Sequence, residues 1–144
     1  MNWSHFNYHE LKPNGFLYAG ISAGLKDSRK KDLALILAPQ NSVCSGIFTQ
    51  SIVRAPSVEI CNERLENSSG NIRAILINSG QANACNGDIG MRDSLLATKE
   101  LAKELNIKED KVLICSTGVI GVPIPMHKLI DNIPILVDSL THNN

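Results

Sequence analysis

The chain has 144 residues, 43% of them hydrophobic, and its 14 Lys and Arg balance its 14 Asp and Glu. This length and composition fit one globular domain that can fold without disulfides or metal ions. A formal net charge of zero excludes the long-range positive field that collects nucleic acid or anionic membranes. The first fifteen residues carry no secretory pattern, and no apolar run approaches the roughly 20 residues of a membrane span. We therefore expect a cytoplasmic protein that binds neither nucleic acid nor membrane.

The first half of the chain predicts strands and turns. The apolar stretch at 15–25 is interrupted by glycines and predicts a bent strand. The continuous apolar run LALILA at 33–38 predicts a strand buried on both faces. Residues 43–49 predict a strand that returns along the first. Residues 53–61 predict another extended piece, broken by Pro56. A polar loop is expected over 63–71.

The second half predicts a strand, a long helix and further short elements. Residues 72–77 and 111–115 have the apolar character of strands, and 88–105 shows helical periodicity with an expected weak surface pair between Glu100 and Lys103. Two short helices should follow, the second starting near Pro134. The order of these elements predicts an α/β or α+β layered sandwich of mixed strands and helices.

A first polar loop, NSGQANACNG at 78–87, links the strand ending at Ile77 to the long helix. Its glycines allow backbone geometries that a Cβ would forbid, and its three asparagines supply amide donors and acceptors. Backbone N–H groups at a helix N-terminus can bind an anion. The alternative is an Asn/Gly turn with a helix cap.

A second loop, STGVIG at 116–121, follows the strand ending at Cys115. A Ser/Thr-Gly step at a strand's end can direct a hydroxyl and a backbone N–H to one point, where they would stabilise an oxyanion in acyl transfer. Two alternatives remain at this stage. Ser116 or Thr117 could be a nucleophile, with His127 as the nearest base in the sequence, or the segment is a plain strand-to-helix turn.

At these loops the sequence becomes similar to a known family. It resembles the N-terminal (α) chain of the ornithine acetyltransferase family, the bifunctional glutamate N-acetyltransferases of arginine biosynthesis. The agreement is collinear over nearly the whole chain past residue 14. Its segments are GFLYAGISAGLK, DLALILAP, SGIFTQSIVRAPSV, AILINSGQANACNGDIG and VLICSTGVIGVPIPMHKL.

The resemblance implies a fold shared with self-processing aminopeptidases. Family members cut themselves before a threonine, which becomes the nucleophile of a β chain and moves acetyl from N-acetylornithine to glutamate. Some accept acetyl-CoA as substrate, and no cofactor or metal is implied. The family's oxyanion hole falls on Thr117 and Gly118. The implied partners are the β chain of the same precursor and a second αβ unit, which together give a heterotetramer of two α and two β chains.

The family pattern continues through a Thr-Thr-Asp-Thr segment and a Lys-Gly-Ser-Gly-Met-Ile stretch, and neither occurs in this sequence. We therefore expect 1–144 to be a single partial domain that contributes the oxyanion hole but not the nucleophile. On this interpretation the isolated chain is inactive. The alternative is a truncated, non-catalytic domain that binds a partner or a small ligand.

Overall fold

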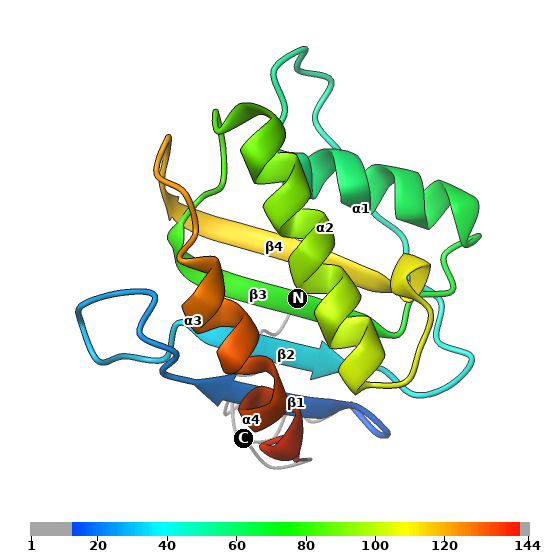
Figure 1. The fold of residues 1–144 in the computed structure, drawn as a ribbon. Helices are drawn as coiled ribbons and strands as arrows, with labels where there is room; N and C mark the ends of the chain where they lie inside the picture. Colours follow the sequence, from blue (N-terminus) through cyan, green and yellow to red (C-terminus); the bar gives the residue numbers. More distant parts are fainter. Residues whose placement is uncertain (1–12, 142–144) are drawn as a thin grey trace, which may run out of the picture.

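A computed structural model describes residues 13–141, so most of the segment without a secretory pattern lies outside the described residues. Four strands form one sheet in the order β1-β2-β3-β4 (Figure 1). β1 and β2 are antiparallel, β2 and β3 are antiparallel, and β3 and β4 are parallel. Their bounds are Leu17–Ile21, Leu33–Leu37, Ala74–Gln81 and Val112–Val119.

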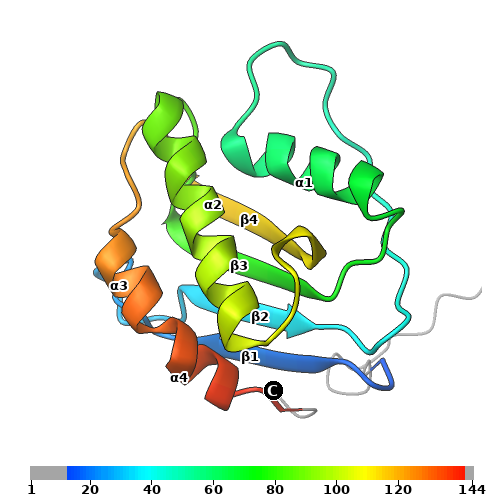
Figure 2. The same ribbon diagram turned by 45° about the vertical axis from the view of Figure 1, so that its right-hand side comes forward.

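Helices cover one face of this sheet. They are α2 (Gly87–Glu104), α3 (Met126–Asp131) and α4 (Ile133–Asp138), while α1 (Pro56–Asn67) lies at the edge of the sheet and a short 3-10 turn, η2 (Glu109–Lys111), precedes β4. Figures 1 and 2 show α2, α3 and α4 on the same side of the sheet. No helix among the described residues is long and apolar enough to cross a bilayer.

The core lies between these helices and the sheet. Leu33 and Leu76 from the strands are buried against Leu101 of α2 and Leu129 of α3. These side chains share a face because strand residues alternate sides and cross-strand partners point the same way. The layered mixture of strands and helices is the fold class that the sequence predicts.

On the opposite sheet face, Cys61 of α1 packs at the edge in one cluster with Leu113 and Ile75, and the rest of the face carries apolar side chains without a helical layer among residues 13–141. Ile36, Ile75 and Ile77 lie on it and are only half-buried. Such a face is expected to pack against something, since apolar area exposed to water costs about 25 cal/mol per Å².

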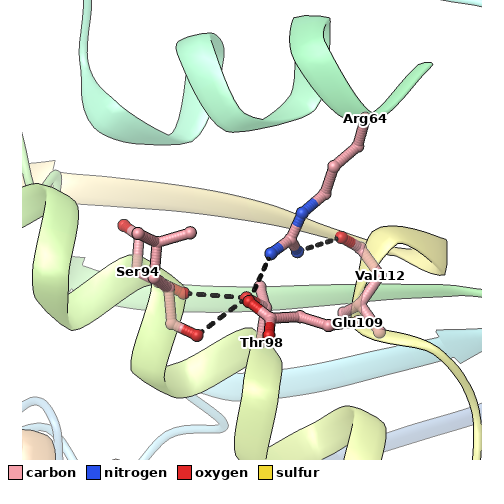
Figure 3. Close-up of polar contacts among 6 residues, drawn as sticks. Arg64, Ser94, Thr98, Glu109 and Val112 are labelled. Carbon is pink, nitrogen blue, oxygen red and sulfur yellow. Dashed lines mark hydrogen bonds and ion pairs between the residues drawn. The ribbon is translucent and has the colours of Figure 1, made fainter. Parts of the chain in front are cut away.

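Helix α1 lies along the free edge of β4 and satisfies two of its carbonyl groups. The Arg64 guanidinium donates to the Val112 carbonyl over 2.6 Å and to the Glu109 carboxylate over 2.8 Å (Figure 3). The Cys61 thiol donates to the Ile114 carbonyl over 3.3 Å. Unpaired edge groups would otherwise be buried without partners, so α1 protects the edge as far as Ile114.

Helix α1 was expected as an extended piece followed by a loop, and this prediction is wrong. Pro56 starts the helix rather than breaking a strand, because proline lacks the N–H that a first helical position does not use. Residues 43–49 form no strand and run as irregular chain. The long helix, the two C-terminal helices and the Glu100–Lys103 ion pair at 3.7 Å agree with the sequence prediction.

Candidate functional site

The two polar segments singled out in the sequence are parts of strands. β3 continues to Gln81 and β4 to Val119, so the strands do not end at Ile77 and Cys115 as expected. The polar composition suggested loops, but the parallel ladder remains in register through both segments. Pairing between strands therefore overrides the local preference of these residues.

The register brings the two segments side by side at the carboxyl ends of β3 and β4. Each residue of the Asn-Ser-Gly sequence faces its counterpart in the Ser-Thr-Gly sequence. The pairs are Asn78 with Ser116, Ser79 with Thr117 and Gly80 with Gly118.

The paired glycines are required by backbone geometry. Gly80 and Gly118 have φ angles of +136° and +133°, values that L side chains rarely adopt. A Cβ on Gly118 would overlap the Gly80 carbonyl. A Cβ on Gly80 would lie 3.0 Å from the Leu25 carbonyl oxygen and from Cγ of Lys26. Only glycine at both positions allows this close approach.

Asn78 joins the two segments beneath the exposed surface. Its side chain is buried, its Nδ2 donates to the Gln81 carbonyl over 3.1 Å, and its Oδ1 accepts from the Ser116 hydroxyl over 2.6 Å. In the described part of the chain, no hydrogen bond joins the exposed His127 to Ser116 or Thr117. The geometry therefore does not support His127 as the base of the nucleophile alternative.

Thr117 and Gly118 are both exposed. Val112 and Ile114 turn their carbonyls toward α1, whereas the Val119 carbonyl accepts from an amide that follows β3. Backbone groups alternate sides along a strand, so the Thr117 carbonyl faces β3. In a trans peptide the carbonyl and the N–H that follows it point in opposite directions. The Gly118 N–H therefore faces the free edge of β4, beyond the part of that edge that α1 covers.

An open cleft of about 560 Å³ lies at this end of the sheet, between the β1–β2 loop and the ends of β3 and β4. The loop is held by buried Asp32, whose carboxylate accepts from the N–H groups of Ala23 (2.7 Å) and Lys26 (3.0 Å). The cleft is lined by Leu25, Lys26, Asp27, Ser79, Gly80, Gln81, Gly118 and Val119.

The segment between β3 and α2 is a structural turn. Buried Asn83 donates from Nδ2 to the Gly90 carbonyl and to the Ser94 hydroxyl, both over 2.8 Å. Asn86 donates to Asn83 Oδ1 and to the Val122 carbonyl. These side-chain amides are engaged within the chain, as an Asn/Gly turn predicts, but Asn86 makes no side-chain cap bond to α2.

Sequence reasoning missed Lys26 as a member of this site and placed Asn78 and Ser79 in a separate loop. Lys26 is 53 residues from Ser79, to whose hydroxyl its Nζ donates over 3.1 Å. The only available signal was the polar character of the Asn-Ser-Gly segment, because residue spacing does not report which strands are neighbours.

Comparisons with known proteins show the family to which the chain belongs. The sequence model of the ArgJ family matches residues 17–144. An arginine biosynthesis bifunctional protein of Prochlorococcus marinus subspecies pastoris is 66% identical over 135 residues, which are 94% of this chain and 34% of that relative. The chain thus spans about a third of the length of the curated relatives that it matches.

Two solved structures have the same fold. The ornithine acetyltransferase of Mycobacterium tuberculosis, solved in complex with ornithine, has a TM-score of 0.85 and 34% identity, covering 90% of this chain and 69% of that chain. An arginine biosynthesis bifunctional protein of Bacillus halodurans has a TM-score of 0.79 and 32% identity, covering 84% of this chain and 62% of that chain. The chain belongs to the ArgJ family.

Proposed function

We propose that Thr117 and Gly118 form the oxyanion hole of a glutamate N-acetyltransferase. The observation that carries this proposal is the exposure of both residues at one strand end, with the Gly118 N–H directed away from the β3 ladder. The Thr117 hydroxyl and this N–H would donate to the same carbonyl oxygen as it becomes negative. One such donor contributes about 3–4 kcal/mol to lowering the barrier.

The substrates follow from family membership. The relatives are named for arginine biosynthesis, and the Mycobacterium tuberculosis structure contains ornithine. We propose acetyl transfer from N-acetylornithine to glutamate, with acetyl-CoA as a further acetyl donor and no cofactor. The nucleophile would be the first threonine of a β chain from the same precursor, in a cytoplasmic assembly of two α and two β chains. Residues 1–144 would be a partial domain of that enzyme.

The surface supports the need for a partner. Ile47 and Ile52 are almost fully exposed in the loop before α1, and Val119 and Ile120 are exposed beside the proposed oxyanion hole. Clustered apolar exposure of this kind typically marks an interaction surface. The half-buried isoleucines of the helix-free sheet face add to it. A β chain packed on these surfaces would bring its nucleophile close to the strand ends.

The test is a chimera in which this chain replaces the corresponding third of the Prochlorococcus relative. Acetyl transfer from N-acetylornithine to glutamate is measured with the unmodified relative as reference. We expect Thr117→Val to lower kcat about 100- to 1,000-fold. Thr117→Ser keeps the hydroxyl and should retain most activity. Ser116→Ala should also retain most activity, because Ser116 is not the nucleophile in this proposal. Equal activity of Thr117→Val and Thr117→Ser would refute the proposed role.

The chain by itself is expected to be inactive with the same two substrates, because an acyl-transfer site also needs a nucleophile and a base. Turnover above a buffer control would contradict this expectation. A folded chimera without activity would instead favour the non-catalytic alternative.

A further inference from the structure

We infer that Asn86 is a positioning residue for the Gly118 N–H. The inference rests on the proposed oxyanion hole and adds a side chain from the β3–α2 turn (82–86), to which neither the family comparison nor the sequence motifs assign this role. It is carried by the bond from Asn86 Nδ2 to the Val122 carbonyl, which ties that turn to the segment directly after the proposed site.

The segment that follows Gly118 has little packing to hold it. Residues 117–122 are all exposed, and this includes the large apolar side chains of Val119, Ile120 and Val122. The parallel ladder with β3 also ends at Val119. Apolar burial and strand pairing therefore do not fix the path of the chain after that residue, and hydrogen bonds to the neighbouring turn must do so.

Two backbone bonds tie this segment to the β3–α2 turn. The Ala82 N–H donates to the Val119 carbonyl, and the Gly121 N–H donates to the Ala84 carbonyl, both over 2.9 Å. Figures 1 and 2 show the chain after β4 running beside the connection from β3 to α2. The exposed segment therefore follows the position of the turn.

Asn86 joins this arrangement to the buried part of the chain. Its Nδ2 donates to the Val122 carbonyl over 3.2 Å and to Asn83 Oδ1 over 3.1 Å. Asn83 is fully buried, and its own Nδ2 donates to the Gly90 carbonyl and the Ser94 hydroxyl, both over 2.8 Å. Since a carbonyl only accepts, these bonds fix which end of the Asn83 amide faces Asn86. The exposed segment is thus attached through Asn86 to helix α2.

This attachment restricts the direction of the Gly118 N–H. Gly118 has a φ of +133° and, as a glycine, more backbone freedom than its neighbours, so the strand end would reorient most easily there. Val119 follows it directly and is held by its bond to the turn. A donor that is already oriented stabilises the oxyanion without any reorganisation during the reaction. Asn86 would therefore act on the proposed site through the backbone, without touching the substrate.

The test replaces Asn86 by side chains that keep a helix cap but lack the amide. Asn86 is the residue before α2, and it makes no side-chain cap bond there. Asp and Ser are about as favourable as Asn at such a position, so a capping role would survive both substitutions. Asn86→Asp and Asn86→Ser both lose the bond to Val122, and only the first adds a charge.

Both variants are made in the chimera described above. Each should lower kcat about tenfold, a part of the roughly 100- to 1,000-fold that the loss of a whole donor costs. KM should change little, because the donor acts on charge that develops only in the transition state. Without substrate, hydrogen–deuterium exchange over 117–122 should be faster in both variants than in the unmodified chimera.

Asn132→Asp is the matched control. Asn132 is likewise the residue before a helix, α4, and its Nδ2 donates to the Lys128 carbonyl over 2.8 Å. It does not line the cleft, so its substitution should leave both kcat and the exchange over 117–122 unchanged.

Three results would overturn the inference. They are an unchanged kcat or unchanged exchange in both Asn86 variants, a loss of kcat in Asn86→Asp alone, which would be a charge effect, and an equal loss in Asn132→Asp. The exchange measurement needs no substrate, and the oxyanion hole is tested separately by Thr117→Val against Thr117→Ser. Failure of the inference and failure of the proposed function are therefore distinguishable.

Discussion

The glycine pair at the proposed site makes a sharp prediction for Gly118→Ala. The new Cβ would meet the Gly80 carbonyl, and an alanine would have to hold a φ near +133°. The backbone conformation costs about 1–3 kcal/mol for a residue other than glycine. The steric overlap adds about 1–3 kcal/mol, since β3 is packed and cannot move freely. The expected loss in the free energy of unfolding is therefore about 2–6 kcal/mol.

Gly121→Ala separates the two contributions. Gly121 has a φ of +76°, but nothing lies within 4 Å of a Cβ built on it. Its substitution should cost only the left-handed strain, about 1–2 kcal/mol. Urea unfolding of the 144-residue chain, followed by circular dichroism, gives both values. If Gly118→Ala costs no more than Gly121→Ala, the close approach of the two strand ends is refuted.

Three further predictions concern the packing of α1, the response to pH and the exposed loop. Arg64→Met should lower the free energy of unfolding by about 2–3 kcal/mol, because a buried carbonyl loses its charged donor. Arg54 is exposed and its ion pair with Glu59 spans 3.8 Å, so Arg54→Met should change this free energy by less than about 0.5 kcal/mol. Equal losses for the two variants in urea melts would contradict this prediction. Burial raises the pKa of the Cys61 thiol above its ordinary value of 9.0, so above pH 9 the unfolded state binds fewer protons and stability falls as pH rises. From pH 8 upward, the free energy of unfolding should therefore decline less steeply with pH in Cys61→Ala than in the wild type. Identical slopes would argue against the burial of this thiol. Finally, the wild-type chain should self-associate in sedimentation experiments, and replacing Ile47 and Ile52 by serine should reduce this association; a monomeric wild type would count against the interaction surface.

The elements that could be predicted are those whose own residues carry the signal. The apolar run containing Leu33 predicts its strand and the periodic segment of α2 predicts its helix. The prediction that the strand is buried on both faces is wrong, because among residues 13–141 a helical layer covers only the face that carries Leu33 and Leu35. Helix α1 could not be predicted from such a pattern. Its buried positions include the polar Ser57 and the charged Arg64, and Arg64 is buried where the edge of β4 offers it a carbonyl partner.

The candidate site shows the same division. The residue types at Thr117 and Gly118 indicate a hydroxyl next to an unhindered N–H, and this much is local chemistry. The expected loop boundaries were wrong, because a parallel ladder extended both strands through their polar ends. The bond from Lys26 to Ser79 depends on a β1–β2 loop that folds over Gly80, and no spacing in the sequence encodes that contact.

The sequence by itself determined the family, the mixed layered fold and the pair of residues proposed to receive negative charge. These are carried by ordered motifs and by periodicities of 2.0 and 3.6 residues, which are properties of neighbouring positions. Only the tertiary structure decided that the Asn-Ser-Gly and Ser-Thr-Gly segments lie in register, that Gly80 and Gly118 touch, and that Lys26 reaches Ser79. These contacts depend on which strands become neighbours, and that choice is made by burial of the whole core rather than by local preference.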